Sequence, residues 1–291
     1  MRLQGLRGSA ARWVAAALLL TAGIAVATPS EKSQQGSKPT PTRQSDSVSR
    51  VEHGQIDEVV EPAVAELIER GNRLTRAERY DEAIALYKAA LDKAGRPVFT
   101  LYLNLGSASL LKQDFPASIA YYRRALAMRP TNATVHFSLG EALFSDKQYG
   151  EAEGEYRKCI ELTPAGAPNA PAHHALGLVL YSQQKVEAAI AEYRTATEQS
   201  RGVFPEAHYN LGAALLNRKQ YEDAEREFRL AIEQQRKDFP QAHFNLAVVL
   251  ERLRRFREAA AEYEIYLRQQ PDAEDAEKMR IHIEGLKKRV N

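Results

Sequence analysis

The feature that most constrains this chain is a motif that returns at a fixed spacing. The stretch PEAHYNLGAALL (205–216) has a near copy, PQAHFNLAVVL (240–250), and related segments occur upstream at intervals of 34 to 37 residues. A catalytic constellation is assembled once from distant parts of a chain, whereas a packing unit can be copied, so the fixed spacing predicts repeated architecture. Six small residues mark the same phase of the repeat: Gly71, Gly106, Gly140, Gly177, Gly212 and Ala247.

Each of these anchors stands in a recurring order of small and large residues. Leucine precedes the anchor in every repeat except the first, which has Arg70, and an aromatic residue follows 16 positions later, from Tyr87 to Tyr263. Apolar residues recur at helical spacing, and no stretch alternates long enough to predict a strand. The order resembles the tetratricopeptide repeat, in which small positions let two antiparallel helices approach. The resemblance implies an all-α fold, a right-handed superhelical solenoid of antiparallel helix pairs.

The resemblance covers residues 61–271, which hold six repeats. Prolines agree with it, because they occur just after expected second helices or at the start of expected first helices. These prolines are Pro130, Pro164 and Pro271 after second helices, and Pro205 and Pro240 at the start of first helices.

Residues 272–291 predict a further helix that caps the exposed core of the last repeat. Asp272 is the expected N-cap, because its side chain can accept hydrogen bonds from free backbone N–H groups. One face of this helix is apolar, and the other is charged. The apolar face contains Ala276, Met279, Ile283, Leu286 and Val290.

The N-terminal sequence predicts export. Residues 1–27 place three arginines ahead of an apolar run, 13–27, that ends in small residues, which is the pattern of a cleaved secretory signal. The alternative is that this run stays as an uncleaved membrane anchor, but it is shorter than the roughly 20 residues of a spanning helix, so we expect cleavage and no membrane span afterwards. Residues 28–60 are rich in Ser, Thr, Pro and Gln at their start and are expected to form a disordered tether. We therefore expect a periplasmic or cell-envelope location, with secretion as the alternative.

Charge and motifs exclude several classes of function. The formal net charge is only +2, and the predicted signal carries three of the arginines, so the body lacks the positive field of a non-specific nucleic-acid binder. Nucleophile-elbow, phosphate-loop and paired-cysteine motifs do not occur, and the single cysteine, Cys159, has no intramolecular partner. We therefore expect no catalytic residue, no cofactor and no nucleic-acid partner.

Four histidines at the same place in consecutive repeats raise the question of a metal site. Metal ligands lie about 2 Å from the ion, whereas equivalent helices in neighbouring repeats stand roughly 8–10 Å apart, so one ion cannot reach them all. We expect packed imidazoles with a hydrogen bond, and no metal. The four are His136, His173, His208 and His243.

By resemblance to the family, the first helices line a concave groove that binds a protein or peptide segment. Asparagines at the matching positions could hold the backbone of an extended peptide, because an amide offers both a donor and an acceptor. The alternative is that Tyr-Asn is simply a common pair in this repeat. His174 faces away from the other four histidines and is a weak ligand candidate. The predicted groove residues are Asn104, Leu110, Phe137, Phe144, His174, Tyr181, Tyr209, Asn210, Phe244 and Asn245.

These observations predict an exported scaffold or adaptor that binds an envelope or secreted protein through its groove. The alternative is a structural module that assembles into homo-oligomers through the end of the array. In both interpretations the protein is not an enzyme, and fold alone does not identify the partner.

Overall fold

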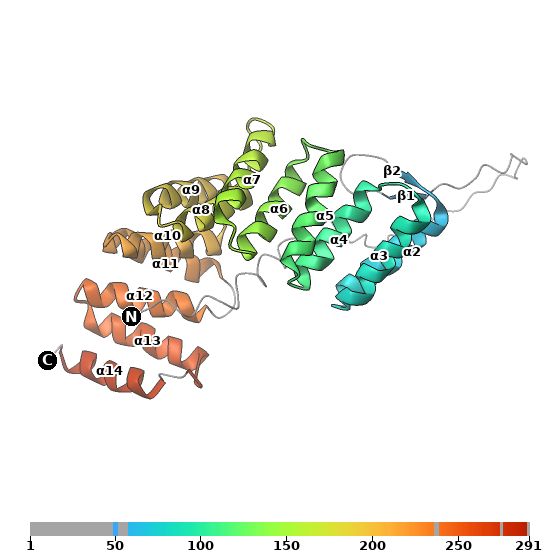
Figure 1. Cartoon of the computed structure of the whole chain (residues 1–291). Helices are drawn as coiled ribbons and strands as arrows, with labels where there is room; N and C mark the ends of the chain where they lie inside the picture. Colours follow the sequence, from blue (N-terminus) through green and yellow to red (C-terminus); the bar gives the residue numbers. More distant parts are fainter. Residues whose placement is uncertain (1–48, 52–57, 236–238, 274–275, 290–291) are drawn as a thin grey trace, which may run out of the picture. The chain divides into compact units, whose positions relative to one another are not determined.

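The structure is a computed structural model of the chain and describes residues 49–51, 58–235, 239–273 and 276–289. The chain divides into two compact units, unit 1 up to Pro130 and unit 2 from Thr131. Each unit is built from consecutive helix pairs, whose first and second members we name the A and B helices (Figure 1). The predicted all-α, helix-pair architecture is confirmed. The predicted signal, 1–27, and most of the predicted tether lie outside the described residues.

Unit 1 contains two repeats. Its A helices are α2 (Pro62–Arg76) and α4 (Phe99–Leu111), and its B helices are α3 (Tyr80–Ala94) and α5 (Phe115–Met128). Two short strands, β1 (Ser49–Val51) and β2 (Glu58–Val60), pair antiparallel, and β1 contacts α2. Both strands fall within 28–60, where the sequence predicted a tether. The difference has a physical cause, because this end of the range is richer in valine and Val60 is buried.

Unit 2 contains the other four repeats and a final helix. Its A helices are α6 (Ala133–Ser145), α8 (Ala170–Ser182), α10 (Pro205–Asn217) and α12 (Pro240–Arg252). Its B helices are α7 (Tyr149–Leu162), α9 (Val186–Gln199), α11 (Tyr221–Gln234) and α13 (Phe256–Gln269), and the last helix is α14 (Ala276–Lys288). Each B helix also contacts the following A helix, so the unit is a continuous stack (Figure 1). No helix of the described ranges is long and apolar enough to cross a membrane.

The recurring glycine and aromatic residue explain how each pair packs. A Cβ placed on Gly106 would lie 2.6 Å from the ring of Tyr122, and one on Gly177 would lie 2.5 Å from the ring of Tyr193. Both rings are fully buried, so they fill the space that a side chain on the A helix would take. The same contact occurs at Gly71, Gly140 and Gly212. Glycine therefore lets the A helix approach the B-helix ring.

The turn between the A and B helices is also the same in every repeat. In the second repeat, the N–H of Gln113 donates to the carbonyl of Leu110, and the N–H of Asp114 donates to that of Ser109, which is the Schellman arrangement. This turn needs a left-handed residue, usually glycine, yet no repeat has glycine there. The residues with φ between 59° and 68° are Glu78, Gln113, Lys147, Gln184, Lys219 and Arg254.

The helix ends agree with the prolines, whereas the start of the last helix differs from the prediction. The second helices end shortly before Pro130, Pro164 and Pro271, and the A helices α10 and α12 begin at a proline. Asp272 lies in a turn and is not the N-cap of α14, whose first assigned residue is Ala276. The predicted apolar face is buried at four of its five positions, and Val290 lies outside the described residues.

Candidate functional site

The four repeated histidines lie between the A and B helices of their own repeats. Each Nδ1 lies 2.6–2.7 Å from a glutamate oxygen, and because a carboxylate only accepts, each Nδ1 carries the proton. The packed, hydrogen-bonded imidazoles agree with the prediction, but their glutamate partners were missed, although His and Glu recur 19 residues apart in four repeats. Within the described ranges, no three His, Cys, Asp or Glu side chains gather as a metal site. The pairs are His136–Glu155, His173–Glu192, His208–Glu227 and His243–Glu262.

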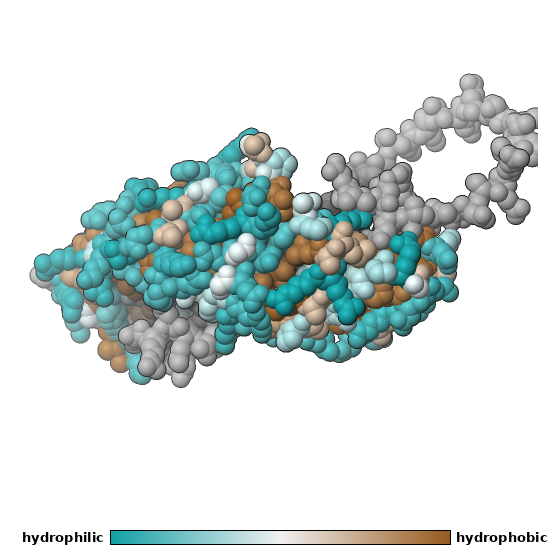
Figure 2. Space-filling model, turned by 45° about the horizontal axis from the view of Figure 1, so that its top comes forward, coloured by the Kyte–Doolittle hydropathy of each residue, from teal (hydrophilic) through white to brown (hydrophobic). Residues whose placement is uncertain are grey.

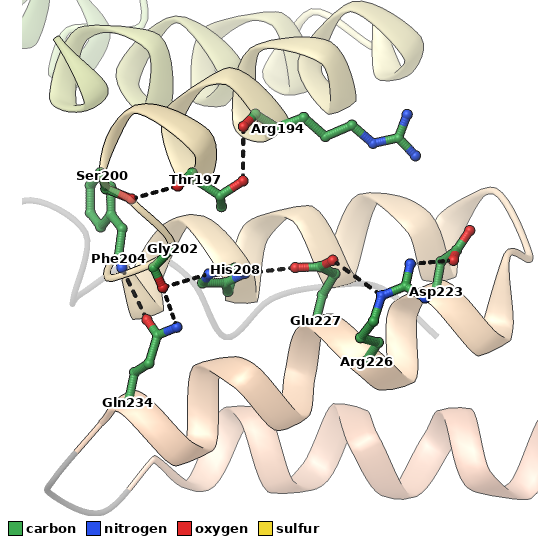
Figure 3. Close-up of polar contacts among 10 residues, drawn as sticks. All are labelled: Arg194, Thr197, Ser200, Gly202, Phe204, His208, Asp223, Arg226, Glu227 and Gln234. Atoms are coloured by element: carbon green, nitrogen blue, oxygen red, sulfur yellow. Dashed lines mark hydrogen bonds and ion pairs between the residues drawn. The ribbon is translucent and has the colours of Figure 1, made fainter. Parts of the chain in front are cut away.

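His208 has a second partner, shown in Figure 3. Its Nε2 lies 3.1 Å from the carbonyl oxygen of Gly202, so both ring nitrogens face acceptors. The side chain of Gln234 also donates to the Gly202 carbonyl and accepts from the N–H of Phe204 at 3.0 Å. Residues of α10 and α11 thus hold the loop that leads from α9 into α10.

Aromatic rings recur along the A helices of unit 2, one repeat after another. The A-helix ring packs on the B-helix ring of its own repeat with centroids 5.5–5.8 Å apart and with tilted or edge-on planes. Such pairs contribute about 0.5–1.5 kcal/mol beyond the area they bury. The A-helix members are neither fully buried nor fully exposed, so part of each ring reaches the surface. The pairs are Phe137–Tyr156, His174–Tyr193, Tyr209–Phe228 and Phe244–Tyr263.

Two further aromatic rings, from the loops between repeats, pack against these A-helix rings. Phe204 packs on His174 with centroids 4.9 Å apart, and Phe239 packs on Tyr209 at 5.1 Å. The sequence interpretation missed both, although the dipeptide Phe-Pro at the start of two successive A helices is a visible signal. The aromatic cluster of these repeats is therefore built from the A helix and from the loop that leads into the next A helix.

The asparagines of unit 2 link one A helix to the preceding one. The Nδ2 of Asn245 donates to the Tyr209 hydroxyl at 3.1 Å, and the Nδ2 of Asn217 donates to the Tyr181 hydroxyl at 3.4 Å. The Nδ2 of Asn210 lies 2.8 Å from the Nε2 of His174. These amides therefore have a structural task between repeats, which the sequence interpretation did not foresee. Their role in holding a peptide stays a prediction.

His174 is neutral in this arrangement. Burial lowers its pKa to about 4, from an ordinary value of 6.5. The neutral ring can accept at Nε2 from Asn210, which a charged ring could not do. His174 is thus an acceptor within the aromatic face, and its nitrogen is already engaged.

The first-helix positions of unit 1 carry a different, hydroxyl- and amide-rich lining. The Oδ1 of Asn72 accepts from the Tyr87 hydroxyl at 2.8 Å and from the Nδ2 of Asn104 at 3.1 Å. Ser107 shares a hydrogen bond of 3.0 Å with the Tyr122 hydroxyl. Of the ten predicted residues, Asn104 and Leu110 lie in unit 1 and the other eight in unit 2.

The eight predicted residues of unit 2 form one recurring surface, which we call the A-helix face. It consists of Phe137, Phe144, His174, Tyr181, Tyr209, Asn210, Phe244 and Asn245, all of them partly exposed. Phe144 also packs on Tyr149, with ring centroids 5.6 Å apart.

The wider surface is mostly hydrophilic. In Figure 2, hydrophobic colour appears mainly in seams between hydrophilic ridges, and the exposed large hydrophobic residues of the described chain are Met128, Val203 and Ile281. A cavity of about 410 Å³ in unit 1 is lined by residues that include Tyr102 and Tyr121. A second, of about 260 Å³, lies along the charged side of α11. Neither cavity includes any of the ten predicted residues.

The repeats identify the class of protein. A family model described as tetratricopeptide repeat matches residues 68–133, 112–167, 174–239 and 220–274. Together these segments cover more than half of the chain. The chain belongs to the tetratricopeptide repeat family.

Solved structures of the same fold are similar over most of this chain. PilW, a widely conserved type IV pilus biogenesis factor, is 15% identical with a TM-score of 0.66, covering 75% of this chain and 99% of its own. The pilF protein of Pseudomonas aeruginosa is 17% identical with a TM-score of 0.65, covering 76% of this chain and 97% of its own. YrrB, described as a TPR protein with an unusual peptide-binding site, is 21% identical with a TM-score of 0.53, covering 67% and 97%.

A curated human relative matches a shorter part. The protein O-mannosyl-transferase TMTC2 of Homo sapiens is 31% identical over 87 residues, which are 29% of this chain. The match spans only 10% of that transferase. Transferase activity therefore belongs to a protein of which this chain matches a small segment.

Proposed function

We propose that this protein is an exported, non-catalytic scaffold that binds an extended segment of a partner protein along the A-helix face of unit 2. The observation that carries the proposal is the run of partly exposed aromatic side chains on four successive A helices, exemplified by Phe137, Tyr209 and Phe244. Aromatic rings offer large contact area at little cost in side-chain entropy, and they are common anchors of protein interfaces. A face that repeats from helix to helix suits an extended ligand better than a compact one.

Backbone recognition adds to these apolar contacts. The Nδ2 atoms of Asn210 and Asn245 are used between repeats, but within the described chain no group donates to their Oδ1 atoms. Each Oδ1 can accept from a backbone N–H of the ligand, and its amide is already held in place by His174 or Tyr209. Held donors and acceptors bind with less loss of entropy than free ones. The peptide-binding site attributed to YrrB supports the idea that a scaffold of this fold can present such a surface.

The partner class and location follow from the N-terminal sequence. The predicted signal over 1–27 and the polar stretch that follows favour export, so we propose an envelope or secreted protein as the partner. Self-assembly into homo-oligomers is the alternative, and a mass that rises with protein concentration in light scattering would support it instead.

Site-specific crosslinking tests the proposal. A photo-crosslinking amino acid replaces Tyr209 on the A-helix face or, as the matched control, Arg194 on the exposed side of α9. In cell-envelope extract, the Tyr209 probe is expected to capture a partner that the Arg194 probe does not. A variant with Phe137→Ala, Asn210→Ala and Phe244→Ala should lose this partner while keeping its helical circular dichroism. Capture from both positions, or retention by the variant, would place the binding surface elsewhere.

A further inference from the structure

One buried carboxyl group in unit 2 lacks the hydrogen bonds that such a group normally makes. Glu141 of α6 is 3% exposed, and neither of its side-chain oxygens has a hydrogen-bond partner among the described residues. Its burial raises its pKa well above the usual range of a glutamate. Glu225, the other buried glutamate among the described residues, is paired with Arg229 and Arg255. Burying an unpaired carboxyl group is unfavourable, so its presence calls for a physical reason.

The equivalent positions of other repeats show two ways in which the fold avoids this cost. In unit 1 the position is polar and paired, because Asn72 and Ser107 each hydrogen bond to the tyrosine hydroxyl of their own repeat. In the rest of unit 2 it is apolar, as Leu178, Ala213 and Val248. Glu141 follows neither solution.

The position of Glu141 points to a ligand. It lies four residues after Phe137 and three before Phe144, so the three side chains share one side of α6. The Phe137 ring packs on Tyr156, and burial, followed by the nearby Glu141 carboxyl group, raises the pKa of Tyr156. The carboxyl group is therefore close to aromatic rings at the start of the A-helix face.

A carboxylate flanked by aromatic rings selects a cation. An ammonium or guanidinium group can pair with the carboxylate by charge-assisted hydrogen bonds and contact the ring faces at the same time. A metal ion is a poorer match, because calcium takes at least six oxygen ligands and magnesium an octahedral set. An apolar or anionic ligand group would leave the carboxyl group unpaired.

We propose that Glu141 determines the specificity of the A-helix face by pairing with a lysine or arginine side chain of the bound segment. The inference rests on the proposed function and deepens it. The basic side chain approaches between Phe137 and Phe144, and the glutamate side chain turns outward to meet it. Binding then exchanges an unpaired buried carboxyl group for a hydrogen-bonded ion pair.

A peptide library tests this specificity on the full chain. The probes are 12-residue peptides with varied apolar and aromatic positions and one position that is lysine, arginine, norleucine or glutamate. The wild type is expected to bind the lysine and arginine peptides at least tenfold more tightly than the norleucine versions, as measured by fluorescence anisotropy. Glu141→Gln should reduce this preference to less than twofold while leaving norleucine affinity unchanged. Glu222→Gln, on the exposed side of α11, is the control that should keep the preference.

The outcomes separate the two proposals. If peptides bind the wild type without preferring a basic residue, the role of Glu141 is wrong and the proposed function stands. If Glu141→Gln weakens lysine and norleucine peptides equally, Glu141 acts through the fold, and the specificity role is again wrong. If no peptide binds the wild type, the proposed function and this inference both fail. Glu141→Leu, which should fold well because leucine suits this position in α8, confirms that loss of preference is not loss of structure.

Discussion

Units 1 and 2 pack their helices in the same way and differ in the side chains that their A helices carry next to this packing contact. In both, a glycine on the A helix contacts a buried aromatic ring of the B helix. Three residues before the leucine position, unit 1 has Leu67 and Tyr102, whereas every repeat of unit 2 has a histidine bonded to glutamate. Two residues before the leucine position, unit 1 has the aliphatic Ile68 and Leu103, whereas unit 2 has the aromatic rings of Phe137, His174, Tyr209 and Phe244. The positions that define the fold are therefore separate from those that give each unit its chemistry.

The largest expected difference between the units is a sensitivity of unit 2 to acid through His174. Its pKa of about 4 in the folded chain lies below the ordinary 6.5, so between these values the unfolded state binds a proton that the folded state does not. Stability therefore falls as pH decreases from 7 toward 4, and His174 alone accounts for up to about 3 kcal/mol at pH 4. Urea unfolding at both pH values measures this loss.

His174→Phe is the matched variant, because repeats 3 and 6 have phenylalanine at this position. It should remove the His174 share of the acid sensitivity while the four His–Glu pairs remain. An equal pH dependence in wild type and variant would show that His174 is not held in its neutral form by burial.

The next effect tests whether the two units do share their packing. Gly106→Ala in unit 1 and Gly177→Ala in unit 2 each place a Cβ within 2.6 Å of a buried ring, and each should destabilise its unit by about 2 kcal/mol. Gly154→Ala in α7 is the control, because its Cβ meets nothing within 4 Å and alanine favours a helix by up to about 1 kcal/mol. Thermal unfolding measures all three.

The sixth repeat is the exception in sequence, since Ala247 takes the place of the glycine, 16 residues before Tyr263. If Gly106→Ala and Gly177→Ala are as stable as Gly154→Ala, the rings can shift to make room for a Cβ. The glycines would then not be required for the approach of the helices.

A smaller effect should have opposite signs in the two units. Glu141→Leu removes an unpaired buried carboxyl group and should stabilise unit 2 by about 1–2 kcal/mol at pH 7. The raised pKa means that the folded state holds its proton to higher pH, so the gain should grow as pH rises above 4.5. Asn72→Leu in unit 1 should destabilise by a similar amount, because Tyr87 and Asn104 lose their shared acceptor. Destabilisation by both substitutions would mean that Glu141 has a partner after all.

The sequence predicted the fold well because the packing positions repeat. Six copies of a small residue, usually glycine after leucine, followed 16 positions later by an aromatic residue, define helix pairs without any knowledge of distant contacts. The sequence did not predict the two strands at the end of the tether. A short valine-containing segment forms a strand only when a partner strand and α2 are present to pair and pack with it. The prediction of Asp272 as the N-cap of the last helix was wrong. Aspartate is a favourable N-cap residue, but the residue type alone does not determine where the preceding turn ends and the helix begins.

The candidate site was only partly predictable for a related reason. The aromatic A-helix positions follow from the repeat register, but their partners come from other helices and loops. Asn210 bonds to His174 across 36 residues, and Phe204 reaches the same ring from a loop. Glu141 stayed hidden because a glutamate on a helix is ordinarily solvated, and only the packed structure shows that this one is buried and unpaired. These contacts and this burial depend on how neighbouring helices pack, which the sequence of one repeat does not show.

The smallest expected effect concerns the A–B turn, which both units build in the same way. Lys219 and Gln113 occupy the left-handed position with φ of 61° and 68°, where a Cβ is unfavourable. Lys219→Gly in unit 2 and Gln113→Gly in unit 1 should each stabilise by about 0.5–1 kcal/mol, because glycine adopts this conformation without strain.

Lys219→Ala and Gln113→Ala keep the Cβ and separate backbone strain from loss of the long side chain. Denaturant midpoints measure the four variants, and a gain from alanine equal to that from glycine would show that the side chain, rather than the backbone, causes the effect. Equal gains from glycine in both units would confirm that the turn belongs to the shared part of the repeat, whereas a gain in one unit only would make it part of what distinguishes them.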